Sequence, residues 1–314
     1  MNDFDYVPFL DPESLYALNP GARDSENKGL NLLLAFDGLA DAGQVVTQIR
    51  SELVEKLPST VLGYFDVDQL LDYRSRRPRI SFVEDHLTAY RAPRLVLYRM
   101  QDGLGQPFLF LTGPEPDLQW ERFSEAVVSL VRRLDVNLVA WVQAVPMPVP
   151  HTRPIGVTVH GNRPELIEGI TSWRATIDLP SGIGHVVEVR LSEAGRNVAG
   201  YALHVPHYLA EAQYPQAAVA GLEYLGAAAS LMLPTDQLRE AGREVERQIG
   251  EQVAGSVEVQ GVVRALEEQY DERVEGLGTR SLLADQNDRL PTADALGAAV
   301  EAYLASREDD GGRP

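Results

Sequence analysis

The sequence predicts an α/β fold, in which a mostly parallel β-sheet lies between layers of helix, followed by a helical appendage. Short and almost unbroken apolar runs alternate with segments of helical periodicity, a pattern typical of strands covered on both faces by helices. The length of 314 residues and the hydrophobic content of 44% suit one large α/β domain with an appendage, or two modest domains. From residue 234 onward the apolar runs stop and only helical periodicity remains, so the appendage is expected to begin there.

Eight segments are the expected strands, and the first of them, at 30–36, is a continuous apolar run too short for a buried helix. The first run ends in Asp37-Gly38, and the fifth leads into a proline-rich loop. The segments cover residues 30–36, 60–65, 94–100, 107–112, 136–145, 156–159, 172–177 and 198–205. Their alternation with helices implies a parallel or mixed sheet.

The expected helices lie between these strands and beyond them. Asp41 stands three residues before Gln44, the spacing of a capping box, and apolar residues follow at helical intervals. Asp117 is expected to cap the most regular helix, which carries one apolar stripe up to residue 134. The remaining helices are expected at 183–194, 215–233, 292–306 and, as an antiparallel hairpin, within 235–270.

Changes in composition divide the chain into four segments. An N-terminal surface segment, rich in turn-forming residues, covers 1–28, and the α/β/α core covers 29–233. A helical C-terminal extension follows at 234–306, and the polar tail at 307–314 is expected to be disordered.

Composition excludes several kinds of chemistry. The chain has no cysteine, so disulfides, zinc-thiolate sites and catalytic thiols are ruled out. A net charge of -18 argues against nucleic acid or anionic membranes as partners, because both require clustered basic residues. The start of the chain lacks the pattern of a signal peptide, and no apolar run reaches the ~18 residues of a membrane span. We therefore expect a cytoplasmic protein, and we expect neither a metal nor a cofactor.

The loop that follows residue 145 holds four candidate site residues. Prolines at several positions stiffen this loop, so it loses less conformational entropy on ordering than an ordinary loop. The polar residues that it presents, together with the short strand after it, are His151, Arg153, His160 and Asn162. The alternative is that each imidazole only hydrogen-bonds loop backbone.

Further candidates stand at other strand ends. Asp37 and Asp41 flank the first strand-to-helix turn, although Asp41 is already explained as a cap. Glu115 could pair with Asp117 as acid and base, with the same reservation for Asp117. If the topology brings the loops at 37–41, 113–117, 146–154 and 204–208 together, these side chains share one edge of the sheet.

Two further sequence features are weak indications of a site, whereas a third, Trp173 and Arg174, is harder to dismiss as a surface accident. His204 and His207 have a ligand-like spacing, but Pro206 breaks the helix that would align them, so no metal site is assigned. Residues 181–184 could cradle a phosphate at a helix start, although a simple turn into the helix is the favoured explanation. Trp173 and Arg174 could recognise a carboxylate or phosphate, or could staple loops.

The chain resembles the proteasome assembly chaperone 2 family, in the long form with a helical C-terminal extension. The resemblance spans about residues 25–235 and rests on residues 32–43, 109–117, 150–154, 159–162, 173–174 and 200–208. It implies a three-layer α/β/α core similar to nucleoside phosphorylases and peptidyl hydrolases, and no established catalytic set. It also implies homo-oligomers, for which a trimer is one candidate, and proteasome subunits or another protein as partners.

Two functional hypotheses follow. The first is a non-catalytic protein that acts as a chaperone or scaffold through protein contacts. The alternative is a small-molecule enzyme or sensor that uses the loops around Asp37, His151, Arg153, His160 and His207. The usual nucleophile-elbow, Walker, zinc-protease and kinase motifs do not occur, so no catalytic residue is assigned.

Overall fold

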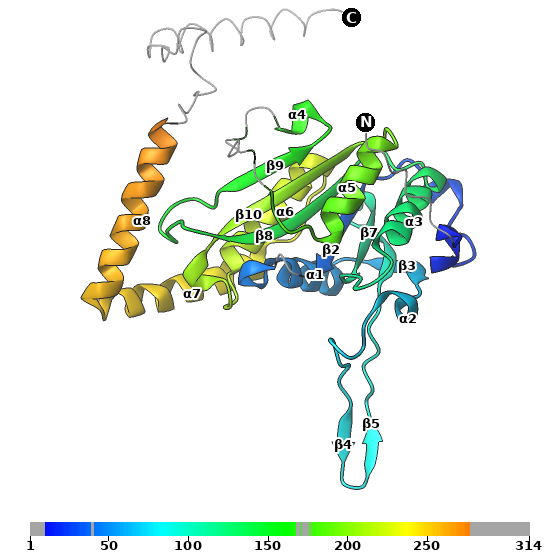
Figure 1. The fold of residues 1–314 in the computed structure, drawn as a ribbon, viewed down its shortest axis with the longest axis horizontal. Helices are drawn as coiled ribbons and strands as arrows, with labels where there is room; N and C mark the ends of the chain where they lie inside the picture. Colours follow the sequence, from blue (N-terminus) through cyan, green and yellow to red (C-terminus); the bar gives the residue numbers. More distant parts are fainter. Residues whose placement is uncertain (1–9, 39–40, 168–169, 171–175, 177, 277–314) are drawn as a thin grey trace, which may run out of the picture. The chain divides into compact units, whose positions relative to one another are not determined.

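Eight strands form one mixed sheet in the order β1-β3-β6-β7-β2-β8-β10-β9. The computed structural model describes residues 10–38, 41–167, 170, 176 and 178–276. The strands of the sheet are β1 (Tyr16–Leu18), β2 (Leu32–Asp37), β3 (Ser59–Phe65), β6 (Val96–Gln101), β7 (Pro107–Pro114), β8 (Val139–Met147), β9 (Val157–Gly161) and β10 (Val198–Pro206). The predicted α/β fold is confirmed, with α1 and α6 on one face of the sheet and α3 and α5 on the other (Figure 1).

The centre of the sheet is parallel and its flanks are antiparallel. Strands β7, β2, β8 and β10 run in one direction, whereas β6, β3 and β1 on one side and β9 on the other pair antiparallel. The central strands are the almost unbroken apolar runs of the sequence, because helices cover both of their faces. Their carboxyl ends therefore meet at a single edge of the sheet.

The helices are α1 (Val45–Lys56), α2 (Val67–Leu70), α3 (Trp120–Arg133), α4 (Pro164–Ile167), α5 (Ile183–Glu193), α6 (Pro215–Ala229), α7 (Asp236–Ala254) and α8 (Val257–Gly276). Short 3-10 turns are η1 (Pro12–Leu15), η2 (Ser25–Asn27), η3 (Ala42–Gln44) and η4 (His207–Leu209). None of the described helices is both long and apolar enough to cross a membrane.

Two hydrophobic cores sandwich the sheet. Alternate residues of β2 point to opposite faces, so that Leu33 joins a core with α1, α6 and α7, whereas Leu34 joins a core with α3 and α5. The alanine-rich helix α6 is largely buried, as its composition predicts. In α7, Leu238 and Ile249 are buried in the first core, whereas Val262 of α8 is about half exposed.

Two features of the fold have no counterpart in the apolar pattern. Residues 16–18 form the edge strand β1 beside β3, and Leu15 before them is fully buried. In the chain segment that connects β3 to β6, where no strand is expected, β4 (Ser81–Val83) and β5 (His86–Thr88) form a separate two-stranded ribbon. Figure 1 shows this ribbon reaching away from the sheet. Short strands with exposed faces carry too little periodicity to be found in a sequence.

The start of α3 differs from the sequence prediction. Gln119, in the left-handed region at φ 57°, directly precedes the helix, and Asp117 does not cap it. Asp117 instead accepts a hydrogen bond from the Asp72 N–H at 2.9 Å and pairs with Arg76 at 2.9 Å. The expected strand at 172–177 lies almost entirely outside the described residues, and the expected helix at 292–306 and the tail lie wholly outside them.

Candidate functional site

The loops after the parallel strands meet at one edge of the sheet, as the topology requires. The Glu115 N–H donates to the Asp37 carbonyl at 2.7 Å, which joins the loops after β7 and β2. The Gly43 N–H donates to the Ala210 carbonyl at 2.7 Å, which joins the loops after β2 and β10. We therefore take this edge as the candidate site.

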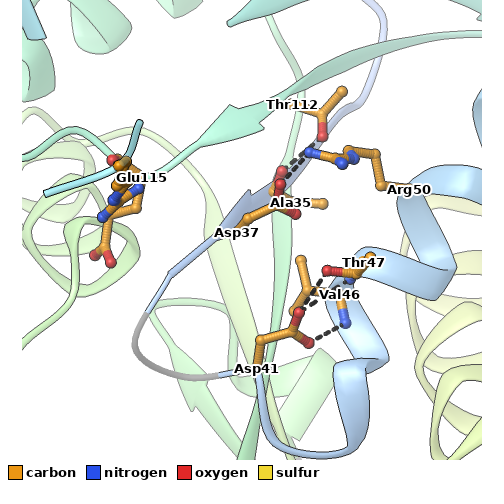
Figure 2. A network of polar contacts seen from close by, with 9 residues as sticks. Ala35, Asp37, Asp41, Val46, Thr47, Arg50, Thr112 and Glu115 are labelled. Carbon is orange, nitrogen blue, oxygen red and sulfur yellow. Dashed lines mark hydrogen bonds and ion pairs between the residues drawn. The ribbon is translucent and has the colours of Figure 1, made fainter. Parts of the chain in front are cut away.

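Asp37, the last residue of β2, forms an ion pair with Arg50 of α1 (Figure 2). Both side chains are about one-third exposed, so the pair is only partly screened by water. The Oδ1 atom of Asp37 is buried and has no hydrogen-bond partner among the described residues. Burial raises the pKa of Asp37 above its usual value, although Arg50 opposes this shift. Arg50 was not among the sequence candidates, because nothing local links it to β2.

Asp41 caps α1, as predicted, but without the expected capping box, because Gln44 is left-handed at φ 52° and its side chain makes no cap hydrogen bond. Figure 2 shows both Asp41 oxygens engaged with α1. Its Oδ1 accepts from the Val46 N–H at 2.6 Å, and its Oδ2 accepts from the Thr47 hydroxyl at 2.7 Å. Burial raises the pKa of Asp41, and the hydrogen bonds from Thr47 and Val46 oppose that shift. Its structural role is therefore sufficient to explain this residue.

Glu115 is buried and caps α5 rather than forming an acid-base pair with Asp117. Its Oε1 accepts from the Ile183 N–H at 2.7 Å, while Asp117 pairs with Arg76. A carboxylate thus occupies the positive end of α5, the place that sequence reasoning considered for a phosphate. Residues 181–184 are the turn into this helix.

The imidazole of His185, one turn into α5, reinforces the same cap. Its Nδ1 accepts from the Gly182 N–H at 2.9 Å, and its Nε2 lies 3.0 Å from the Gln143 amide. Burial lowers the pKa of His185, and the neighbouring His160 adds to this effect. Glu115, Gln143 and His185 line a small cavity beside Trp141. Sequence reasoning did not select Gln143 or His185, because they converge only across the sheet.

The loop after β8 closes onto the end of β10. The Tyr208 hydroxyl accepts from the His151 N–H at 2.9 Å and lies 2.8 Å from its Nδ1. Burial lowers the pKa of His151. Arg153 forms an ion pair with Glu267 at 3.3 Å. Two predicted residues therefore lie close together here, with Tyr208 as a partner that the sequence did not single out.

His160 and Asn162 do not share this edge, because β9 runs antiparallel to β10. His160 pairs with Gly200, and its Nδ1 lies 2.9 Å from the Glu188 carboxylate. Asn162 accepts from the Val198 N–H at 3.0 Å, close to the opposite end of β10. The structure thus separates these two residues from His151 and Arg153.

The remaining candidates form no common cluster. His207 begins η4 and packs edge-on against Tyr208, whereas His204 lies 2.9 Å from the Thr158 hydroxyl. Within the part of the chain that the structure describes, no group of three or more His, Asp or Glu residues has the arrangement of a metal site. Trp173 and Arg174 lie outside the described residues.

Comparisons with known proteins place this chain in a family. The PAC2 family model matches residues 35–253, which include β7, β8, β10 and the second half of β2. The chain belongs to the PAC2 family. No curated protein matches it.

Several solved structures share the fold of this chain. A Mycobacterium tuberculosis protein of unknown function, Rv2714, is 42% identical with a TM-score of 0.79, and the match covers 89% of this chain and 95% of that one. A Corynebacterium glutamicum protein of unknown function is 38% identical with a TM-score of 0.80, covering 83% and 98%. The M. tuberculosis proteasome-assembly chaperone homologue Rv2125 is 23% identical with a TM-score of 0.67, covering 74% and 100%, and shows the fold alone.

In this PAC2 protein, most of the predicted site residues have structural partners. Asp41 and Glu115 cap helices, Asn162 closes β9 onto β10, and His151 joins two loops. Such contacts hold loops in place, which gives these side chains a structural role. Asp37 differs, because one of its oxygens is buried without a partner among the described residues.

Proposed function

We propose that this PAC2 protein is a non-catalytic, chaperone-like or scaffold protein that acts through protein contacts. The observation that carries the proposal is the projecting ribbon, here named the arm and defined as residues 74–91. Phe82 and Leu87 in the arm are 69% and 63% exposed. The exposed large apolar side chains of the arm are Ile80, Phe82, Val83, Leu87 and Tyr90.

An arm of this kind requires a partner for physical reasons. A two-stranded ribbon is marginally stable in water when it stands alone, and every residue of β4 and β5 is exposed. Clustered apolar side chains on a surface mark a contact with another protein. The arm therefore provides an interaction surface that the core of the subunit leaves uncovered.

Charge supports a second copy of this chain as one partner. The arm has five Arg against Glu84 and Asp85, a net charge of 5 − 2 = +3, in a chain whose net charge is -18. The rest of the chain therefore carries -18 − 3 = -21. A basic arm is attracted to so acidic a surface, which favours association between copies. A trimer is one assembly compatible with this proposal.

We propose proteasome subunits as the second kind of partner. The support is the PAC2 membership and the name of the related structure Rv2125, a proteasome-assembly chaperone homologue. Binding of this kind requires no catalytic group, in agreement with the structural roles of Asp41, Glu115 and Asn162. A proteasome partner places the proposed role in the cytoplasm.

The arm is tested with the double variant Phe82→Ser/Leu87→Ser. The wild type is expected to be an oligomer in native mass spectrometry and light scattering, and the double variant a monomer with an unchanged circular dichroism spectrum. The matched control is Ser81→Ala/Thr88→Ser, which alters exposed neighbours on the same two strands and should leave the oligomer intact.

A monomeric wild type, or a double variant with the wild-type mass, would contradict self-association through the arm. The same spectra, recorded on protein purified gently from its own cells, test the other partner. A stoichiometric proteasome subunit supports that assignment, and its absence at a protein concentration where the homo-oligomer is intact contradicts it.

A further inference from the structure

A cavity of about 520 Å³ lies between α1, the facing ends of β6 and β7, and the base of the arm. This volume is within the range of small-molecule sites in proteins. None of the contacts proposed above for the arm uses it. Its polar lining consists chiefly of Asp37, Arg50, Glu55, Arg94 and Tyr98.

The rim of the cavity is held in place by close backbone packing. Gly113 at the end of β7 has φ 154°, and a Cβ atom there would lie 2.4 Å from the Arg94 carbonyl oxygen and 2.7 Å from the Leu95 Cα. Only glycine allows this approach. Next to it in β7, the Thr112 hydroxyl donates to the Ala35 carbonyl at 2.7 Å, which ties β7 to β2 (Figure 2). The backbone from which the Arg94 side chain extends is therefore held in a fixed position.

The cavity is lined by equal numbers of positive and negative groups, but within the described chain only two of these groups form an ion pair with each other. Arg50 and Arg94 supply two positive charges, and Asp37 and Glu55 supply two negative ones, so the lining has a net charge of 2 − 2 = 0. Arg50 pairs with Asp37, whereas Arg94 has no ion-pair or hydrogen-bond partner for its guanidinium among the described residues. One cation and one further carboxylate thus stay available to a ligand.

The environment of Asp37 points to a ligand that carries a positive group. One carboxylate oxygen is buried without a partner, and burial raises the pKa of this residue even with Arg50 beside it. The carboxylate is therefore incompletely stabilised by the protein alone. A cation in the cavity would stabilise this carboxylate through its charge, without contacting the buried oxygen.

We propose that this cavity binds a small zwitterion of the amino-acid class, with its carboxylate on Arg94 and its ammonium group towards Asp37 and Glu55. The planar guanidinium of Arg94 suits a carboxylate, which it can bind through two hydrogen bonds. Val54, Val96 and Pro114 also line the cavity, and they favour an apolar side chain on the ligand. The proposal does not depend on the protein partners proposed above, because the lining belongs to a single subunit.

The first experiment screens the twenty standard amino acids for a rise in the melting temperature of the full-length protein, since a ligand that binds only the folded state stabilises it. Isothermal titration calorimetry with L-leucine then gives the dissociation constant. Two ligand controls remove one charge each: L-leucinamide lacks the carboxylate, and 4-methylpentanoate lacks the ammonium group. Both are expected to bind at least about tenfold more weakly than L-leucine, as the loss of a charge-assisted hydrogen bond implies.

The protein variants test the two ends of the ligand separately. Arg94→Gln should weaken the binding of L-leucine at least about tenfold and leave the weak binding of L-leucinamide unchanged. Asp37→Asn should weaken the binding of L-leucine and leave the weak binding of 4-methylpentanoate unchanged. The matched control is Arg79→Gln, an exposed arginine in the arm that does not line the cavity. Circular dichroism confirms that each variant is folded.

Three results would overturn the proposal. The first is that none of the twenty amino acids shifts the melting temperature or gives a saturable titration. The second is equal affinity for 4-methylpentanoate or inorganic phosphate, which would identify a general anion site. The third is an unchanged dissociation constant for L-leucine in folded Arg94→Gln.

Discussion

Glu115 shows how one residue, through its backbone and its side chain, organises the edge of the sheet. Its N–H donates to the Asp37 carbonyl, its own carbonyl accepts from Arg76 at 2.8 Å, and its carboxylate accepts from the Ile183 N–H. One buried residue thus joins the end of β2, the base of the arm and the start of α5. The acid-base role considered for Glu115 is replaced by a positioning role.

Glu115→Ala should lower the free energy of unfolding by about 1–3 kcal/mol, because it leaves the buried Ile183 N–H without an acceptor. Urea unfolding followed by circular dichroism measures this change. The control Glu26→Ala removes an exposed carboxylate and should change the stability by less than about 0.5 kcal/mol. Equal stabilities of the two variants would contradict the capping role.

His185 makes the start of α5 sensitive to pH. Its Nδ1 must stay unprotonated to accept from the Gly182 N–H, and its pKa is lowered by burial and by His160. The other charged groups that face it are Glu188 and Glu115, and both oppose the shift. As the pH falls below the ordinary His value of about 6.5, the unfolded state takes up a proton that the folded state does not.

The stability of the wild type should therefore fall as the pH decreases from about 6.5 towards the lowered pKa of His185, and level off below it. The change attributed to this residue is the difference between the wild type and His185→Gln, in urea unfolding at a series of pH values. An amide oxygen can still accept from the Gly182 N–H without titrating. A constant difference from pH 7.5 to 5 would show that His185 does not have the proposed influence.

At the scale of elements, α5 packs on β8 through a contact that requires glycine. A Cβ atom on Gly184 would lie 2.5 Å from a ring carbon of Trp141, and the Trp141 Nε1 is held by Glu188 at 2.6 Å. The indole ring therefore cannot move aside without breaking a hydrogen bond. The small residue sets how closely α5 approaches the sheet.

Gly184→Ala should lower the free energy of unfolding by about 1–3 kcal/mol through overpacking, although alanine is the better helix former. The matched control is Gly250→Ala in α7, where a Cβ atom meets nothing within 4 Å. That variant should raise stability by up to about 1 kcal/mol. Urea unfolding followed by tryptophan fluorescence measures both, and a stabilised Gly184→Ala would contradict the packing argument.

The strands and helix caps also show how far the local sequence pattern predicts this fold. The strands around 32–37, 107–114 and 139–147 were predictable, because burial on both faces leaves continuous apolar runs. The ribbon β4–β5 was missed for the opposite reason, since its exposed residues show neither strand periodicity nor a continuous apolar run. Asp41 was recognised as a cap from its local spacing, whereas Asp117 was misassigned because its real partners, Asp72 and Arg76, lie about forty residues earlier.

The whole molecule combines a strongly acidic chain with one basic, apolar arm. Because the chain has a net charge of -18, most surfaces of two copies repel each other. Attraction between copies is therefore concentrated at the basic arm. The same arm joins the core next to the cavity lined by Arg94. Contacts with proteins and with a small zwitterion are thus proposed for neighbouring but separate parts of the subunit.

The sequence by itself determined the α/β class, the order of the main strands and helices, the exclusion of cysteine chemistry and the PAC2 resemblance. These properties are local: each depends on burial, caps or residue types within a short window. Only the tertiary structure decided that β9 runs antiparallel, which separates His160 and Asn162 from His151 and Arg153. It also decided that Arg50 lies on Asp37, that Glu115 caps α5, and that Arg94 faces a cavity. Each of these depends on strand order and direction, which arise from pairing between segments far apart in the chain.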